Sequence, residues 1–111
     1  DMARQAISTR DFAKLAAVAE HNCLKMHSVM WSSRPPVVYW NSATMRCLQA
    51  VRDLQADGVG VFFTMDAGPQ VKAVCLPEHA DTVRASLSGI DGVNQVMESA
   101  LGDGARLVES A

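Results

Sequence analysis

The sequence lacks the long apolar runs, the charge bias and the leader segment that mark specialised classes of protein. No apolar run approaches the roughly 20 residues that a helix needs to cross a bilayer. Residues 1–5 contain no apolar core of a signal peptide. The net charge is −2 and the pI about 5.8, and no basic patch stands out. We therefore expect neither a membrane nor a nucleic-acid partner.

Cysteine is scarce, and the three cysteines, Cys23, Cys47 and Cys75, lie far apart in the chain. An odd number without close pairs argues against a disulfide framework, and the lack of C-x-x-C spacing argues against a zinc site. We predict no metal-ligating cluster. Buried free thiols in a reducing compartment are the simplest interpretation, and they favour a cytoplasmic location.

Common catalytic motifs are missing as well. There is no Walker loop, no G-x-G-x-x-G, no Ser/His/Asp arrangement and no internal repeat. The 111 residues have an ordinary globular composition and predict one domain, residues 1–111. Because the first residue is Asp1 rather than methionine, we expect a fragment or a processed piece of a longer protein.

An apolar stripe predicts one long helix in the first third of the chain. Apolar residues recur at spacings of three and four from Phe12 to Met30, with Thr9 as the expected N-cap. The proline pair at residues 35–36 ends this helix. Residues 1–8 are interpreted as a short lead-in.

A second helix is predicted after a short strand at residues 37–40. Asn41 or Ser42 can cap it, and its apolar positions fall within residues 45–54. Gly58 suits the left-handed residue that follows a helix.

The last half of the chain predicts two hairpins around a third helix. A strand from Val61 ends at Asp66, and a second strand covers residues 71–76. A helix opens at Pro77-Glu78, and strands follow at 93–100 and 105–109. The fold class is therefore α+β, a mainly antiparallel sheet with helices on one face, close to the split ferredoxin-like pattern.

Asp66 is the last side chain before the Gly-Pro corner between the two central strands, and it allows two interpretations. It can be a turn aspartate whose carboxylate accepts neighbouring backbone N–H groups. It can also be an acid aimed into a cleft from a loop on rigid strands. Spacing alone favours the turn interpretation.

Other ionisable residues give weaker signals. His27 lies at the edge of the first stripe, where it could act as an acid or base near neutral pH. A partly buried structural role with one hydrogen bond is the favoured alternative. Asp11, Glu20 and Glu78 are placed near helix starts or on exposed faces, and none forms a spaced pair with Asp66.

Three segments resemble one family in order and spacing. Residues 63–72, FTMDAGPQVK, resemble the TMDAGPNVK signature of mevalonate diphosphate decarboxylase. Residues 22–28, NCLKMHS, resemble its N-x-L-x-M-H-[AS] stretch, and residues 35–41, PPVVYWN, its PP-x-x-Y-x-N stretch. Together they identify the chain as similar to the C-terminal domain of this GHMP-kinase-type enzyme.

The resemblance implies an activity and a partner domain. The family phosphorylates the 3-hydroxyl of mevalonate 5-diphosphate with ATP and Mg²⁺, and loss of phosphate and CO₂ gives isopentenyl diphosphate. The N-terminal domain of such enzymes carries the ATP phosphate loop, which nothing in this sequence matches. ATP and Mg²⁺ would therefore bind mainly outside this chain, which alone would have no turnover. A homodimer is also implied.

The resemblance also implies roles for particular residues. Asp66 would be catalytic, orienting the 3-hydroxyl or taking its proton, and Ala67 and Gly68 would let the chain approach the substrate closely. His27 is carried over as a substrate-binding candidate. Gln70 stands where the family usually has asparagine, so no contact is carried over to it.

Two alternatives remain open. One is a related mevalonate or phosphomevalonate kinase or decarboxylase. The other is a non-catalytic α+β binding or dimerisation module that kept the scaffold.

Overall fold

The computed structural model describes residues 1–109, which form helices around one antiparallel hairpin. The elements are α1 Met2–Ser8, α2 Phe12–Trp31, α3 Ser42–Ala56, β1 Val61–Thr64, β2 Lys72–Cys75, the 3-10 helix η1 Pro77–His79 and α4 Ala80–Ser88. The predicted α+β class with antiparallel strands is confirmed. No helix in this part of the chain is both long and apolar enough to cross a membrane.

Side-chain caps set where the two long helices begin. α2 begins after Asp11, whose carboxylate accepts the N–H of Lys14 at 3.0 Å, so the prediction of Thr9 as its cap is wrong. α3 begins after Asn41, whose side chain accepts the N–H of Thr44 at 2.9 Å. Thr44 Oγ1 in turn accepts the N–H of Asn41 at 3.2 Å. This reciprocal pair confirms the predicted start of the second helix.

The predicted lead-in is instead the helix α1, which packs against α2. Thr9 ends α1, and Asp11 donates its N–H to the carbonyl of Ala6 at 2.9 Å. Ala6 is the buried residue of this helix, whereas Met2 and Ile7 are exposed. Because α1 has only seven residues, it is shorter than the window of about 11–18 residues in which apolar periodicity predicts a helix.

β1 and β2 form the predicted hairpin, with Val61 opposite Cys75 and Thr64 opposite Lys72. β1 is buried at its first three residues, whereas β2 alternates between exposed and half-buried residues. β1 is therefore the interior strand, and β2 has one face toward solvent.

One edge of β1 has no neighbouring strand in the described chain. Gly60 accepts the N–H of Leu76 at 3.0 Å, so every second residue from Gly60 faces β2. The N–H and C=O groups of Val61, Phe63 and Met65 therefore face the opposite way. Because buried backbone groups need partners, these three residues must find theirs elsewhere.

The buried apolar residues form one cluster that joins the hairpin to α2, α3 and α4. Phe63, Met65 and Val51 are at most 1% exposed and lie at its centre. Its other members are Cys23, Cys47, Leu48, Val61, Val83 and Leu87. All three cysteines are free, as predicted, and Cys75 is half-buried.

The further strands predicted from the sequence are wrong. Residues 37–40, 93–100 and 105–109 have no regular secondary structure, so the sheet described here has two strands. Val93 and Val96 pack against the core, but Leu101 and Leu107 are fully exposed. An alternating pattern favours a strand locally, but a strand also needs a neighbour for its N–H and C=O groups.

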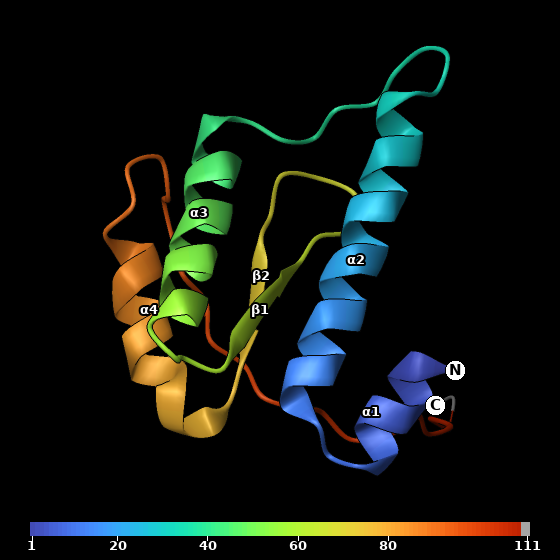
Figure 1. Cartoon of the computed structure of the whole chain (residues 1–111). Helices are drawn as coiled ribbons and strands as arrows, with labels where there is room; N and C mark the ends of the chain where they lie inside the picture. Colours follow the sequence, from blue (N-terminus) through green and yellow to red (C-terminus); the bar gives the residue numbers. More distant parts are fainter. Residues whose placement is uncertain (110–111) are drawn as a thin grey trace.

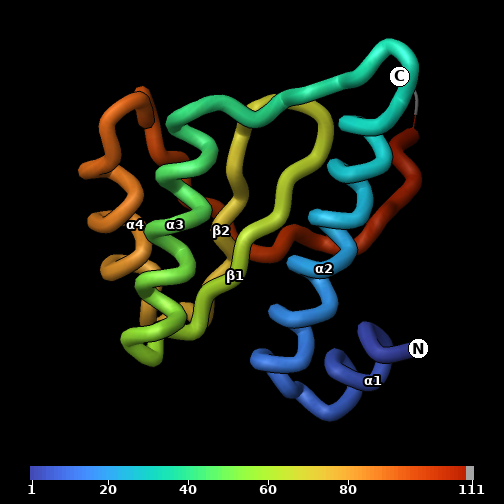
Figure 2. The backbone as a smooth tube through the Cα atoms, turned by 45° about the horizontal axis from the view of Figure 1, so that its top comes forward, coloured from blue at the N-terminus to red at the C-terminus, as the bar shows by residue number. Residues whose placement is uncertain are grey.

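Figures 1 and 2 show α2 and α3 on either side of the hairpin, with α4 along the outer side of α3. Both α2 and α3 contact β1, and α4 contacts α3 and β2. The turn between β1 and β2 lies at the end of the molecule where α2 ends and α3 begins (Figure 1). Residues near the end of α2 are thereby brought to the end of β1.

We expect the substitution Phe63→Ala to lower the free energy of unfolding by about 3–5 kcal/mol, because it leaves a cavity at the centre of the core. Val74→Ala is the matched control on the exposed side of β2, where the side chain is 40% exposed. It should cost less than about 1 kcal/mol. Guanidinium unfolding followed by far-UV circular dichroism measures both. Equal losses would contradict the assignment of β1 as the interior strand.

Candidate functional site

The carboxylate of Asp66 stands at the turn of the hairpin. β1 ends at Thr64, Met65 is fully buried, and the side chain of Asp66 is 72% exposed. The Asp66 carboxylate forms an ion pair with the ammonium group of Lys72, the first residue of β2. The acid is thus open to solvent and connected to the opposite strand.

The residues after Asp66 leave the backbone of the turn uncovered. Ala67 is exposed and carries only a methyl group. Gly68 has a φ of +108°, and a Cβ at this position would collide with the side-chain oxygen of Gln70. This conformation favours glycine, because other residues rarely adopt it. A ligand could therefore approach the chain closely beside Asp66.

Lys72 holds the pKa of the Asp66 carboxyl below its ordinary value. The hydrogen bond from the Lys72 side chain is the largest cause, and the positive charge of Lys72 adds to it. Asp66 is therefore ionised at neutral pH. An anionic carboxylate can accept a hydrogen bond from a hydroxyl group, or its proton, without first losing a proton of its own.

His27 lies in the interior, against Met65, the residue that precedes the exposed Asp66. His27 is 0% exposed, and its Nε2 lies 3.1 Å from the carbonyl oxygen of Met65. The thiol of Cys23, one turn earlier on α2, lies 3.8 Å from the same oxygen. The ring also packs at 5.6 Å from that of Trp40. The prediction that His27 contacts a substrate directly stays a prediction.

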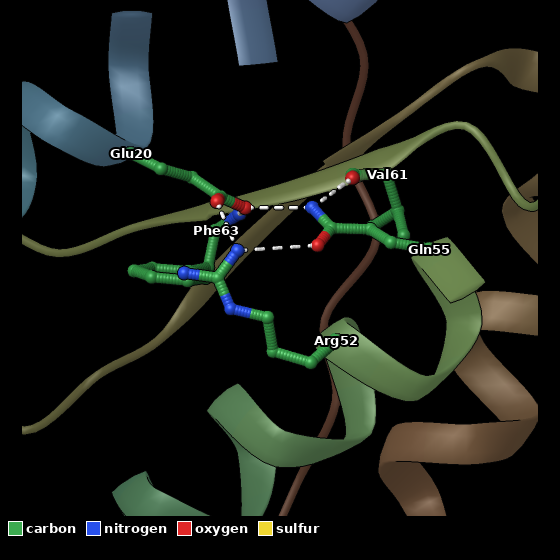
Figure 3. A network of polar contacts seen from close by, with 5 residues as sticks. All are labelled: Glu20, Arg52, Gln55, Val61 and Phe63. Carbon is green, nitrogen blue, oxygen red and sulfur yellow. Dashed lines mark hydrogen bonds and ion pairs between the residues drawn. The ribbon is translucent and has the colours of Figure 1, made fainter. Parts of the chain in front are cut away.

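Glu20 was predicted to lie near a helix start or on an exposed face, and this prediction is wrong. Glu20 is 6% exposed and points from α2 toward β1 (Figure 3). Its carboxylate accepts the N–H of Phe63 at 3.3 Å and the side-chain amide of Gln55 at 2.7 Å, and it pairs with Arg52 at 2.8 Å. Gln55 also donates to the carbonyl of Val61 at 2.9 Å.

The spacing of Glu20 could have revealed that its side chain is buried. Glu20 lies four residues after Ala16, three before Cys23 and seven before His27, so it shares their face of the helix. A charged residue on a buried face needs a partner, and Arg52 on the next helix supplies it.

Two hollows on the described surface are not lined by Asp66. One, of about 350 Å³, lies along α2 and is lined by residues that include His21, Asn22 and Lys25. Another lies between the start of α2 and the residues that precede β1. No group of three or more His, Cys, Asp or Glu side chains within residues 1–109 could hold a metal ion. The exposed Asp66 carboxylate lies outside both of these hollows.

Comparison with known families assigns the chain. A family model, described as the mevalonate 5-diphosphate decarboxylase C-terminal domain, matches residues 1–107. The chain belongs to the mevalonate 5-diphosphate decarboxylase C-terminal domain family. The resemblance seen in the three sequence segments is thereby confirmed.

Relatives of this decarboxylase C-terminal domain are much longer than the chain. The chain is 30% identical over 89 residues to a phosphomevalonate decarboxylase of Haloferax volcanii. This match covers 79% of the chain and 28% of that protein. A solved structure of the mevalonate diphosphate decarboxylase from Enterococcus faecalis, concerned with ATP binding mediated by mevalonate diphosphate, is 33% identical and superposes with a TM-score of 0.75. The match covers 82% of the chain and 29% of that structure.

A further structure shares the fold of this decarboxylase domain and carries ligands. It is of a protein abbreviated MDDEF, in complex with MVAPP, AMPPCP and magnesium. Its identity is 33% and its TM-score 0.76, and the match covers 82% of the chain and 28% of that structure. The chain thus spans under a third of the length of each of these relatives.

We expect Lys72→Met to raise the pKa of Asp66 toward the ordinary value near 3.8, because both the hydrogen bond and the positive charge are lost. In the wild type, the ion pair between Asp66 and Lys72 is present at pH values above the ordinary carboxyl pKa. It is lost as the pH falls through the lower pKa that Asp66 has in the folded state. NMR titration of the Asp66 carboxyl carbon measures the shift. Lys25→Met on α2 is the control and should leave the titration unchanged; an unchanged pKa in Lys72→Met would contradict the ion pair.

Proposed function

We propose that the chain is the C-terminal domain of an ATP-dependent decarboxylase of mevalonate 5-diphosphate. The products are isopentenyl diphosphate, ADP, phosphate and CO₂. Family membership supports the reaction class. The observation that carries the assignment to this chain is the exposed, anionic carboxylate of Asp66 at the hairpin turn.

In this proposal Asp66 acts on the 3-hydroxyl of the substrate. Its carboxylate accepts the hydroxyl hydrogen bond and orients the oxygen for phosphoryl transfer, or takes its proton. When phosphate leaves, the same negative charge favours positive charge that develops at the substrate carbon. Lys72 supports this role because it keeps Asp66 ionised.

The residues around Asp66 complete the chain's part of the site. Ala67 and Gly68 are assigned to substrate contact, because neither side chain blocks the backbone of the turn. Direct substrate contact by His27 has less support, because the side chain is fully buried. Its Nε2 reaches Met65, which precedes Asp66, so an indirect contribution fits better.

ATP and Mg²⁺ are assigned to a part of the protein outside these residues. The described residues offer no grouped ligands for a cation, and no Walker-type loop occurs in the sequence. The MDDEF complex with AMPPCP and magnesium supports a need for both in the whole enzyme. We therefore place residues 1–111 as a single domain that works with an N-terminal ATP-binding domain. We also propose a homodimer in the cytoplasm.

The Haloferax volcanii relative supports a second candidate substrate, mevalonate 5-phosphate. That protein is a phosphomevalonate decarboxylase, and its match covers 79% of the chain. Asp66 would act on the 3-hydroxyl in the same way, since the two substrates differ in the phosphates at the other end of the molecule.

We expect Asp66→Asn in the full-length enzyme to lower kcat by about 10²–10⁴-fold, because the base is lost while its size is kept. Substrate binding should persist, since Asn can still accept one hydrogen bond. Asp57→Asn, at the exposed end of α3, is the control and should keep wild-type turnover. Product formation is followed by ATP-dependent CO₂ release. Turnover of Asp66→Asn within a few-fold of wild type would remove Asp66 from the reaction.

Parallel assays with mevalonate 5-diphosphate and mevalonate 5-phosphate separate the two substrates. Higher kcat/KM for the monophosphate would favour the second one. No CO₂ release from either compound by the full-length wild-type protein would favour a binding or dimerisation module. Residues 1–111 alone are expected to release none.

A further inference from the structure

The carbonyl of Met65 is held by a helix and not by the sheet. The last paired residues of the hairpin are Thr64 and Lys72, and Met65 lies one residue beyond them. Its carbonyl faces away from β2 and lies 3.1 Å from His27 Nε2. Since a carbonyl oxygen only accepts, Nε2 must carry the proton and donate it. The peptide bond between Met65 and Asp66 is thereby tied to α2.

The environment of His27 keeps the ring in this one position. The side chain is fully buried, and its ring packs against Trp40, which itself meets Trp31 edge-on at 4.9 Å between centroids. Within residues 1–109 the other ring nitrogen, Nδ1, is buried without a protein partner. An apolar side chain would fill this space without that cost. The ring is therefore best explained by the single hydrogen bond that it gives to Met65.

The Asp66 turn thus has two kinds of support. His27 donates a hydrogen bond to the carbonyl of Met65, in the peptide that carries the Asp66 nitrogen. Lys72 forms an ion pair with the Asp66 carboxylate itself. Misplacement of a reacting group by about 1 Å can cost 10²-fold in rate. A donor that holds the adjacent carbonyl can therefore affect the rate without touching the substrate.

We propose that His27 is a positioning residue, which aims the Asp66 carboxylate through its hydrogen bond to the Met65 carbonyl. The proposal deepens the function proposed above and rests on it. It replaces direct substrate contact by His27 with an action through the backbone. Cys23 lies 3.8 Å from the same oxygen and adds at most a weak second donor.

A pair of amide variants of the full-length enzyme tests this role. His27→Gln keeps an N–H donor at nearly the reach of Nε2, whereas the shorter side chain in His27→Asn falls short of Met65. We expect His27→Asn to lower kcat about 10–100-fold with KM within about 3-fold of wild type. His27→Gln should stay within about 3-fold of wild-type kcat. Equal losses of kcat in both variants would overturn the proposal.

A second measurement separates positioning from stability. Glu20→Gln weakens the contact of the same helix with β1 at Phe63 and leaves Met65 alone. It should lower the melting temperature and keep kcat. If the loss of kcat in Glu20→Gln and His27→Asn is proportional to the fall in melting temperature of each variant, His27 has only a packing role and the proposal is wrong.

NMR titration of the Asp66 carboxyl carbon gives a readout that needs no activity. In His27→Asn the turn should loosen, the Lys72 pair weaken and the Asp66 pKa rise, while His27→Gln keeps the wild-type titration. An unchanged titration in His27→Asn would overturn this proposal even if Asp66 proved essential. If instead Asp66→Asn kept full turnover, the catalytic assignment would fail while the titration still reported on His27.

Discussion

The unpaired edge of β1 is the constraint on which the rest of the structure depends. Val61, Phe63 and Met65 all turn their backbone polar groups away from β2. Side chains supply one partner to each of these residues: Gln55 donates to the carbonyl of Val61, Glu20 accepts the N–H of Phe63, and His27 donates to the carbonyl of Met65. Polar side chains of two helices thus take over part of the hydrogen bonding that a third strand would provide.

This arrangement explains why a two-stranded sheet can sit inside the fold. An isolated hairpin is marginal in water, and a buried edge would leave donors and acceptors unmatched. Glu20 of α2 also binds Arg52 and Gln55 of α3 through its carboxylate (Figure 3). It therefore joins α2 and α3 to β1. Arg52 is half-exposed, with its guanidinium carbon 5.3 Å from the centre of the Phe63 ring, so the buried charge is balanced near the surface.

Local features of the fold could be predicted from the sequence, and features that need a distant partner could not. The two long helices have apolar stripes, and the hairpin has a Gly-Pro corner, so neighbouring residues define them. The strand predicted at residues 93–100 also had a local pattern, but within residues 1–109 no strand lies beside it to complete its hydrogen bonds. Glu20 shows both cases: its spacing on α2 indicates a buried side chain, but its partners at residues 52, 55 and 63 are remote in the chain and could not be identified from the sequence.

Among the described residues the Asp66 carboxylate pairs with Lys72 and not with the backbone N–H groups that the turn interpretation expects, and its role as a reacting acid stays a prediction. The residues on either side of Asp66 differ in burial and in bulk. Met65 is buried and immobilised by α2, whereas Gly68 leaves the next residues free of bulk. The pairing with Lys72 could have been inferred from the hairpin register, which puts Lys72 opposite Thr64. The hydrogen bond from His27 to the carbonyl of Met65 could not have been inferred, because it depends on the end of α2 lying against the end of β1. The role proposed for Asp66 needs exposure and a fixed backbone together, and different elements provide them: the turn exposes the carboxylate, and α2 contacts the carbonyl of Met65.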